Sequence, residues 1–458
     1  MAPYKLLTLG DSVMWGQGLA SQHKFVQLVA GYLAGLHGPV AVAALAHSGA
    51  VVCDNPKPEA AHQAFLFGEL PRSFPSIASQ LEIAGQAAGY GSFLQPNSWD
   101  PKSWQALKAD LGKQIAGYWQ AGGSQPDLIL LDGGINDLGA LQIVVPWLLN
   151  APDPCAPPGA APPQLAQGGA VERILGAFAA GPESFAAFDP NSIQWMTDDQ
   201  FKALIDRYVW NRMRLQVGRL AARFQKSRVV ITGYFPIFTP GSIGGLAAAG
   251  APAAAAVLFA PGLDRRHFQA ALHWAFHPAV DQQALAHRIV HQSALWYSYG
   301  TERLRQVVDE ANQLHGNRFA LADPGFGPDN GALAPDSWLW TFTSLLDEVI
   351  QKILELFGGG GAAPAVESLA SRTAAAAPGG WEDVLGFAAG LALGASIATD
   401  EVGLARASAA TDYNVLSATG RSDPATNAFS GFKAGVASAG HPNLAGAQSY
   451  FAAIKKAL

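Results

Sequence analysis

Short apolar runs without polar alternation recur along this chain, and longer segments of helical periodicity separate them. Uninterrupted apolar runs are typical of strands in a parallel sheet that is covered on both faces. The predicted strands are Leu6–Leu9, Val40–Leu45, Leu128–Leu131, Val229–Gly233 and Phe319–Leu321. The predicted helices are Leu19–Leu36, Trp104–Gln120, Phe201–Gln225, Leu285–Leu314 and a last one that ends at about Ala457. This alternation predicts an α/β fold, with three α/β/α layers around one doubly wound, flavodoxin-like parallel sheet.

One long segment breaks the alternation. Residues 326–425 shift toward Ala and Gly, and we interpret them as a mostly helical insertion before the last helix of a single domain, residues 1–458. Within the insertion, Ser344 and Asp347 have the spacing of a capping box. The apolar residues that follow share one face of a predicted helix over Ser344–Phe357. This helix is either a lid or lipid-facing surface over the site, or an additional helix packed on the core.

Composition narrows the class of protein. Hydrophobic residues make up 49% of the chain and charged residues 14%, which is typical of a globular protein with a large core. A net charge of −6 and the lack of a basic tract argue against nucleic acid as a partner. The first strand begins almost at Met1, so no signal peptide is visible and the compartment stays open. Cys53 and Cys155 either form a disulfide or remain as buried thiols.

Candidate chemistry begins directly after the first predicted strand, at Ser12. A serine there stands at the carboxyl end of a strand and at the N-terminus of a helix, whose free N–H groups suit a developing oxyanion. Gly49 and Asn136 also follow predicted strands, and His441 precedes the last helix. In a parallel sheet such positions converge on one edge, so they predict a serine hydrolase site.

These residues occur in motifs that resemble a known family. Gly10-Asp11-Ser12, the loop residue Gly49, Gly134-Ile135-Asn136-Asp137 and His441-Pro442-Asn443 resemble the four blocks of the SGNH (GDSL) hydrolases, in the same order. The resemblance implies a nucleophile at Ser12 and a general base at His441. It also implies an oxyanion hole from the backbone N–H groups of Ser12 and Gly49 and the Asn136 side chain. Neither a cofactor nor a metal is implied.

The sequence departs from this family at one position. The family usually has an acid three residues before the histidine, where this chain has Ser438. A backbone carbonyl near Ser438 or a distant carboxylate such as Asp423 are the candidates for orienting His441. Each block also has a structural alternative: Ser12 as a turn residue, Gly49 as a tight-turn glycine, Asn136 as an Asx-turn residue and His441 as part of a helix start signal.

Two further motifs carry less information. His273 and His277, like His287 and His291, have i,i+4 spacing but lack the glutamate of a zinc-protease motif, so we interpret them as structural histidines. Gly394–Ala398 only approximates a nucleophile elbow and lies in an Ala/Gly-rich run.

The sequence therefore predicts a serine esterase that acts through an acyl-enzyme on lipid or other acyl esters. It leaves two alternatives, a carbohydrate O-acetylesterase and a catalytically degenerate SGNH-fold binding protein. The expected partners are a small-molecule or lipid ester and, through the insertion, a membrane surface.

Overall fold

Five parallel strands form the centre of the protein. The computed structural model describes residues 2–19, 21–53, 75–85, 115–120, 125–139, 143, 170–192, 195–248, 277, 279–340 and 440–458. In spatial order the strands are β2 (Val40–Ala44), β1 (Tyr4–Leu9), β3 (Leu128–Leu131), β4 (Arg228–Thr232) and β5 (Phe319–Ala322). Every adjacent pair is parallel. This order confirms the predicted flavodoxin-like sheet.

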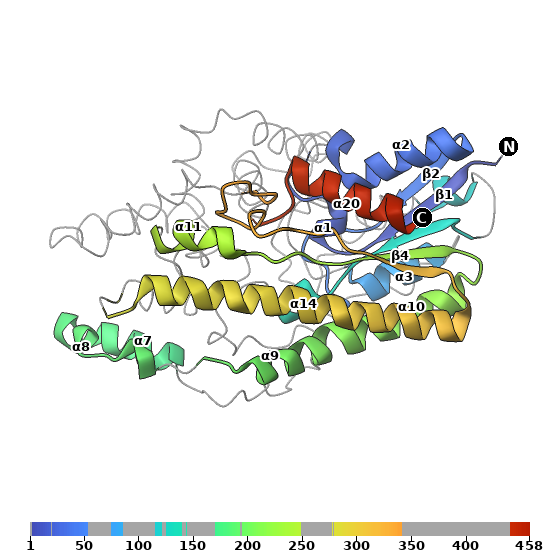
Figure 1. Cartoon of the computed structure of the whole chain (residues 1–458). Helices are drawn as coiled ribbons and strands as arrows, with labels where there is room; N and C mark the ends of the chain where they lie inside the picture. Colours follow the sequence, from blue (N-terminus) through green and yellow to red (C-terminus); the bar gives the residue numbers. More distant parts are fainter. Residues whose placement is uncertain are drawn as a thin grey trace, which may run out of the picture.

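Helices cover both faces of the sheet, which makes three layers (Figure 1). On one face lie α2 (Phe25–His37) and α20 (Leu444–Ala457), which pack against each other. On the other face lie α3 (Ile77–Gly85), α10 (Asn211–Arg223) and α14 (Gln282–His315). Because both faces are covered, the middle strand β3 is apolar throughout, and all four of its residues are buried.

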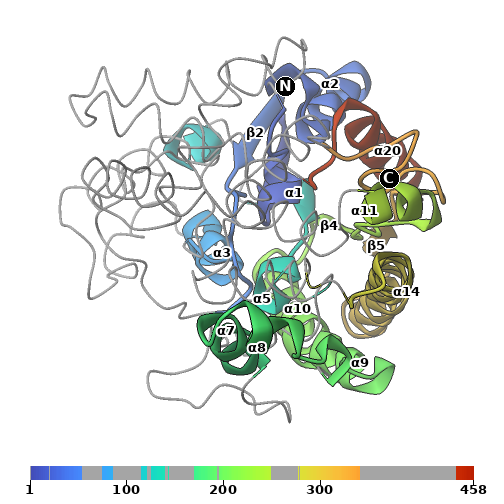
Figure 2. The same cartoon turned by 90° about the vertical axis from the view of Figure 1, so that its left-hand side faces the viewer.

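The direction of winding reverses at β1. The chain passes from β1 to β2 on one side and then to β3 on the other, so the topological switch point lies between the carboxyl ends of β1 and β3, the position where sheets of this kind bind ligands. Two short helices begin there, α1 (Ser12–Trp15) and α5 (Ile135–Leu138). Figure 2 looks onto this carboxyl edge and shows both helices near its centre.

The predicted helix Leu19–Leu36 begins later than expected. A 3-10 turn covers Ser21–His23, Lys24 has an extended backbone, and α2 starts at Phe25. The Lys24 ammonium lies 3.7 Å from the centroid of the Trp15 ring, a cation–π contact. We attribute the late start to this contact, because it holds the Lys24 side chain against the loop that follows α1.

The predicted helix Phe201–Gln225 has three parts. It consists of α9 (Asp198–Ile205), a π-helical turn η4 (Asp206–Trp210) and α10. The start lies three residues earlier than predicted because Thr197 and Gln200 form a reciprocal capping box. The π turn has no signature in the hydrophobic pattern, and it packs against α5.

The other predicted elements differ from the structure by small amounts at their ends. Asp281 caps the start of α14 by accepting from the N–H groups of Gln283 and Ala284, so this helix begins at Gln282. Short helices that the pattern did not predict are α7 (Ala170–Ala179), α8 (Pro182–Ala186), η3 (Pro190–Ser192), η5 (Pro240–Ser242) and α11 (Ile243–Ala248). Among the described residues, no helix is both long and apolar enough to cross a membrane.

Several predicted features lie outside the described residues: most of Trp104–Gln120, the helix Ser344–Phe357, the segment Gly394–Ala398, and Cys155. Residues 326–340, the predicted start of the insertion, are described, and Leu339 and Trp340 are buried in the core. Cys53 is disulfide-bonded, and Cys155 is the other cysteine of the sequence.

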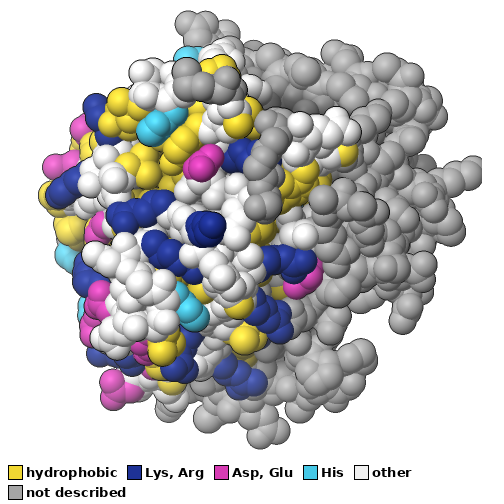
Figure 3. Space-filling model, turned by 90° about the vertical axis from the view of Figure 1, so that its right-hand side faces the viewer, with side chains coloured by type: hydrophobic (Ala, Val, Ile, Leu, Met, Phe, Trp, Pro, Cys, Tyr) yellow, Lys and Arg dark blue, Asp and Glu magenta, His cyan; other side chains and the backbone are white. Residues whose placement is uncertain are grey.

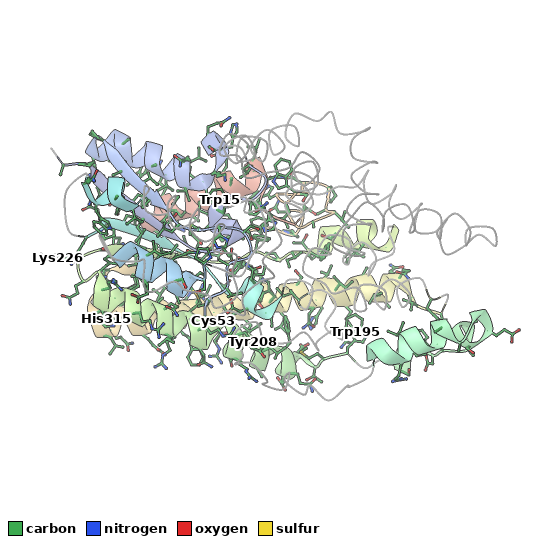
Figure 4. All side chains as sticks on the ribbon, turned by 180° about the vertical axis from the view of Figure 1, so that it is seen from behind. Trp15, Cys53, Trp195, Tyr208, Lys226 and His315 are labelled. Carbon is green, nitrogen blue, oxygen red and sulfur yellow. The ribbon has the colours of Figure 1, made fainter. Side chains whose placement is uncertain are left out.

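The amino edge of the sheet, opposite α1, is rich in basic side chains. Lys and Arg side chains gather on this face (Figure 3). Arg318 donates to the carbonyl oxygens of Ala221, Phe224 and Ser227 at 2.8–3.0 Å, so it closes the C-terminus of α10. Lys226 and His315 mark the same end of the molecule, and Trp195 lies toward the other (Figure 4).

Candidate active site

Ser12 and His441 form the centre of the site. The Nε2 atom of His441 lies 2.7 Å from the Oγ atom of Ser12. The Ser12 side chain is buried, and His441 is partly exposed. A serine hydroxyl that donates to a neutral imidazole at this distance can transfer its proton during attack on a carbonyl carbon.

The turn that carries Ser12 is held from two sides. The Gly10 N–H donates to Oε1 of Gln80 at 2.8 Å, and the Gln80 amide donates back to the Gly10 carbonyl at 3.0 Å. The Asp132 carboxyl packs so closely on Gly10 that an added Cβ would lie 1.9 Å from its Oδ1 atom. This position therefore requires a glycine. Asp11 then caps α1 by accepting from the Val13 N–H, so Ser12 is the first helical residue.

The loop of His441 is held by a short antiparallel pairing with residues 338–340. The Trp340 N–H donates to the His441 carbonyl at 2.8 Å, and the Gly440 N–H donates to the Trp340 carbonyl at 3.0 Å. Asn443 caps α20, and its amide also donates to the Ser337 carbonyl. His441 therefore lies two residues before the N-cap of α20, in the loop that reaches Ser12.

Two further loops meet beside Ser12. Gly49 has φ +80°, a left-handed conformation that favours glycine. The Asn136 amide donates to the Ala50 carbonyl at 3.0 Å, which joins the Gly49 loop to α5. An amide nitrogen has two donor hydrogens, so this contact leaves Asn136 one more. His47 supports the same loop, with its ring nitrogens 2.8 and 2.9 Å from the Ser48 and Pro75 carbonyl oxygens.

Asp137 braces the two loops. Its carboxylate accepts from the Val52 N–H at 2.9 Å and from Arg212 at 2.7 Å. The Arg212 guanidinium comes from α10, just after the π turn, and also lies over the Tyr208 ring. The Asp137 side chain is fully buried, and Arg212 is 16% exposed.

Two carboxyl groups are buried beneath Ser12. Asp132 accepts from the Asp11 N–H at 2.8 Å, and Asp11 accepts from the Tyr234 hydroxyl at 2.5 Å. Burial raises the pKa of Asp11 to about 6, opposed by its bonds from Tyr234 and Val13. Burial and the nearby Asp11 charge raise the pKa of Asp132 well above its usual range.

Sequence reasoning missed four residues of this site: Gln80, Asp132, Arg212 and Tyr234. Asp132 and Tyr234 stand at strand ends, the same signal that pointed to Ser12 and Asn136. Gln80 and Arg212 are helical residues whose role depends on tertiary contacts. Ser438 and Asp423, the candidates for orienting His441, lie outside the described residues.

Two of these histidines, His277 and His291, have structural partners, and His287 is exposed on α14. His277 accepts from the Ala279 N–H through Nδ1, and His291 pairs with Asp198 at the surface. His273 lies outside the described residues. Within the described ranges, no group of three or more His, Cys, Asp or Glu side chains could hold a metal ion.

Comparison with known proteins gives distant structural likenesses. No family model matches the sequence, and no curated protein matches it. A solved phospholipase A1 from Streptomyces albidoflavus NA297 is 15% identical, with a TM-score of 0.31, over 74% of this chain and 88% of that one. A carbohydrate esterase, described as having divergent catalytic and non-catalytic binding functions, is 12% identical, with a TM-score of 0.27, over 78% of this chain and 69% of that one. At these TM-scores the geometry of Ser12 and His441 is the stronger guide to function.

Proposed function

We propose that this protein is a serine hydrolase that cleaves carboxylic esters through an acyl-enzyme on Ser12. The observation that carries the proposal is the 2.7 Å contact between His441 Nε2 and Ser12 Oγ at the carboxyl edge of the sheet. A hydroxyl and an imidazole from opposite ends of the chain meet where open α/β sheets bind their ligands. That is the arrangement required of a nucleophile and its base.

The reaction has two steps. His441 takes the Ser12 proton as Oγ attacks the ester carbonyl carbon, and then gives that proton to the departing alcohol. Water, deprotonated by the same imidazole, attacks the acyl-enzyme and releases the acid. In each step, the Ser12 and Gly49 N–H groups and the Asn136 amide stabilise the oxyanion.

A third group orients the imidazole in this proposal. A backbone carbonyl near Ser438 or the Asp423 carboxylate would hold the His441 tautomer. Such a group tunes the rate, whereas the nucleophile and the base are indispensable.

The proposed substrates are lipid or other long-chain acyl esters. The support is the predicted amphipathic segment Ser344–Phe357, which suits a lid or a lipid surface near the site. A carbohydrate O-acetylesterase is the alternative substrate class, and a binding protein that does not turn over is the alternative to an enzyme.

A series of p-nitrophenyl esters from acetate to palmitate tests this proposal. We expect kcat/KM to rise with acyl length, and Ser12→Ala or His441→Ala to lower kcat by up to about 10⁶-fold. Ser192→Ala, a distant surface serine, is the control and should match the wild type. Activity confined to acetate would move the assignment to a deacetylase, and no turnover in any member would favour a binding protein.

A further inference from the structure

Tyr234 bridges two loops of the candidate site. It lies two residues after the end of β4 and is 5% exposed, so its hydroxyl must find partners inside the protein. The hydroxyl donates to Oδ2 of Asp11 at 2.5 Å and accepts from the Ile135 N–H at 3.3 Å. Both of its hydrogen-bonding functions are therefore used.

Each partner of Tyr234 adjoins a residue of the proposed machinery. Asp11 precedes Ser12, and its Oδ1 atom caps the helix that Ser12 begins. Ile135 precedes Asn136 in α5. The phenol oxygen is thus hydrogen-bonded to the residue before the nucleophile and to the residue before an oxyanion donor. It comes from a third loop, the one that follows β4.

We propose that Tyr234 is a positioning residue that fixes the separation between the Ser12 nucleophile and the Asn136 amide. This inference rests on the proposed function, since it assigns Tyr234 a role in that same reaction. Tyr234 touches neither Ser12 nor substrate in this account, and it acts through Asp11 and Ile135. Asp11 caps α1 and Ile135 lies in α5, so the Tyr234 hydroxyl, by bonding both, sets the position of α1 relative to α5.

The ring of Tyr234 is held independently of its hydroxyl. Trp296 of α14 packs against it with the ring centroids 5.3 Å apart. Replacement by Phe therefore keeps the packing and removes only the bridge, which makes Tyr234→Phe a specific test.

The bridge has a pH dependence that a packing role would lack. Burial keeps the pKa of Tyr234 well above 10, so the phenol remains a donor. Burial is the main reason that the Asp11 pKa is raised, and the Asp137 charge adds to it. Asp132 also lies beside Asp11, and the Asp11 charge raises the pKa of Asp132 in turn. Above about pH 6 the ionised Asp11 carboxylate accepts strong hydrogen bonds from the Tyr234 hydroxyl and the Val13 N–H. Below that pH the protonated carboxyl accepts them more weakly. Loss of the Tyr234 hydroxyl removes a bond that lowers this pKa, so the transition moves to higher pH.

The experiment compares wild type, Tyr234→Phe and Tyr297→Phe as full-length proteins, with kcat and KM for one p-nitrophenyl ester between pH 4.5 and 9. Tyr297 is the matched control because its hydroxyl donates to Asp323 and contacts neither Asp11 nor Ile135. We expect Tyr234→Phe to lower kcat by roughly 10- to 100-fold, as for a small misplacement of reacting groups, with KM within about twofold. Its acid limb should move to higher pH, and Tyr297→Phe should match the wild type.

A second variant isolates the contribution of Asp11 to the acid limb. Asp11→Asn keeps an oxygen for the Val13 N–H but cannot ionise, so the part of the limb that the Asp11 carboxyl contributes should disappear. It also provides the test if Tyr234→Phe does not fold.

The two proposals fail in different ways. If a fluorophosphonate labels Ser12 in the wild type but Tyr234→Phe has the kcat and pH profile of Tyr297→Phe, the positioning role is wrong and the hydrolase stands. The same conclusion follows if Asp11→Asn keeps the wild-type profile. If Ser12 is not labelled in the wild type, the proposed function falls, and the positioning role falls with it.

Discussion

His441 Nε2 lies 2.7 Å from Ser12 Oγ, although the two residues are 429 positions apart in the chain. The parallel sheet accounts for this contact, since β1 delivers Ser12 to the carboxyl edge and the pairing of residues 338–340 with residues 440–443 holds His441 over it.

Removal of the Asn136 amide tests its role as an oxyanion donor. Asn136→Ala should lower kcat by about 10²–10³-fold with little change in KM, because the donor acts on charge that develops in the transition state. Asn312→Ala is the control, since its amide bonds Phe319 at the far edge of the sheet. Equal kcat values for the two variants would remove Asn136 from the site.

Alanine substitutions at two glycines distinguish the effect of backbone strain from an effect on catalysis. Gly49 and Gly38 have φ +80° and +83°, so an alanine costs about 1–3 kcal/mol of stability at either position. Gly38 follows α2 and has open space around it. The temperature of thermal unfolding should fall for both Gly49→Ala and Gly38→Ala, whereas kcat should fall only for Gly49→Ala. A wild-type kcat for Gly49→Ala would identify it as a turn glycine only.

The ion pair of Arg212 and Asp137 should matter for both stability and rate. Arg212→Ala leaves a fully buried carboxylate without its cation, at a cost of about 3 kcal/mol, and it frees the loops on either side of Ser12. Arg214→Ala breaks an exposed pair with Glu310 and should cost less than about 1 kcal/mol. Urea unfolding and kcat of the two variants test this difference, and similar values for both would contradict it.

The two buried carboxyls predict how stability depends on pH. Their pKa values are raised in the folded protein, so their contribution to stability is complete below the ordinary Asp pKa of about 4 and is lost as pH rises through the folded value, about 6 for Asp11. Asp132→Asn should therefore flatten the fall in the free energy of unfolding between pH 5 and pH 8, the range to be measured by urea unfolding. An unchanged slope would show that the folded protein does not hold the Asp132 carboxyl protonated over that range.

Sequence patterns predicted the sheet because each of its strands is a short apolar run that ends in polar or glycine residues. They also placed Ser12, Gly49, Asn136 and His441 at strand or helix ends, where chain order alone brings them to one edge. Tyr234 and Arg212 were not predicted, since their partners lie 223 and 75 positions away and no local pattern encodes such contacts.

Two departures from the predicted helices also accompany tertiary contacts that the sequence pattern does not encode. The extended backbone at Lys24 accompanies its contact with Trp15, and the π turn before α10 precedes the arginine that reaches Asp137. Both features depend on what lies beside the helix and not on the order of apolar residues within it.

The most direct test of the central claim is mass-spectrometric mapping after treatment with a fluorophosphonate. The account predicts one adduct, on Ser12, which is absent in Ser12→Ala and forms far more slowly in His441→Ala. An adduct on another residue, or a folded wild-type protein that forms none, would contradict it.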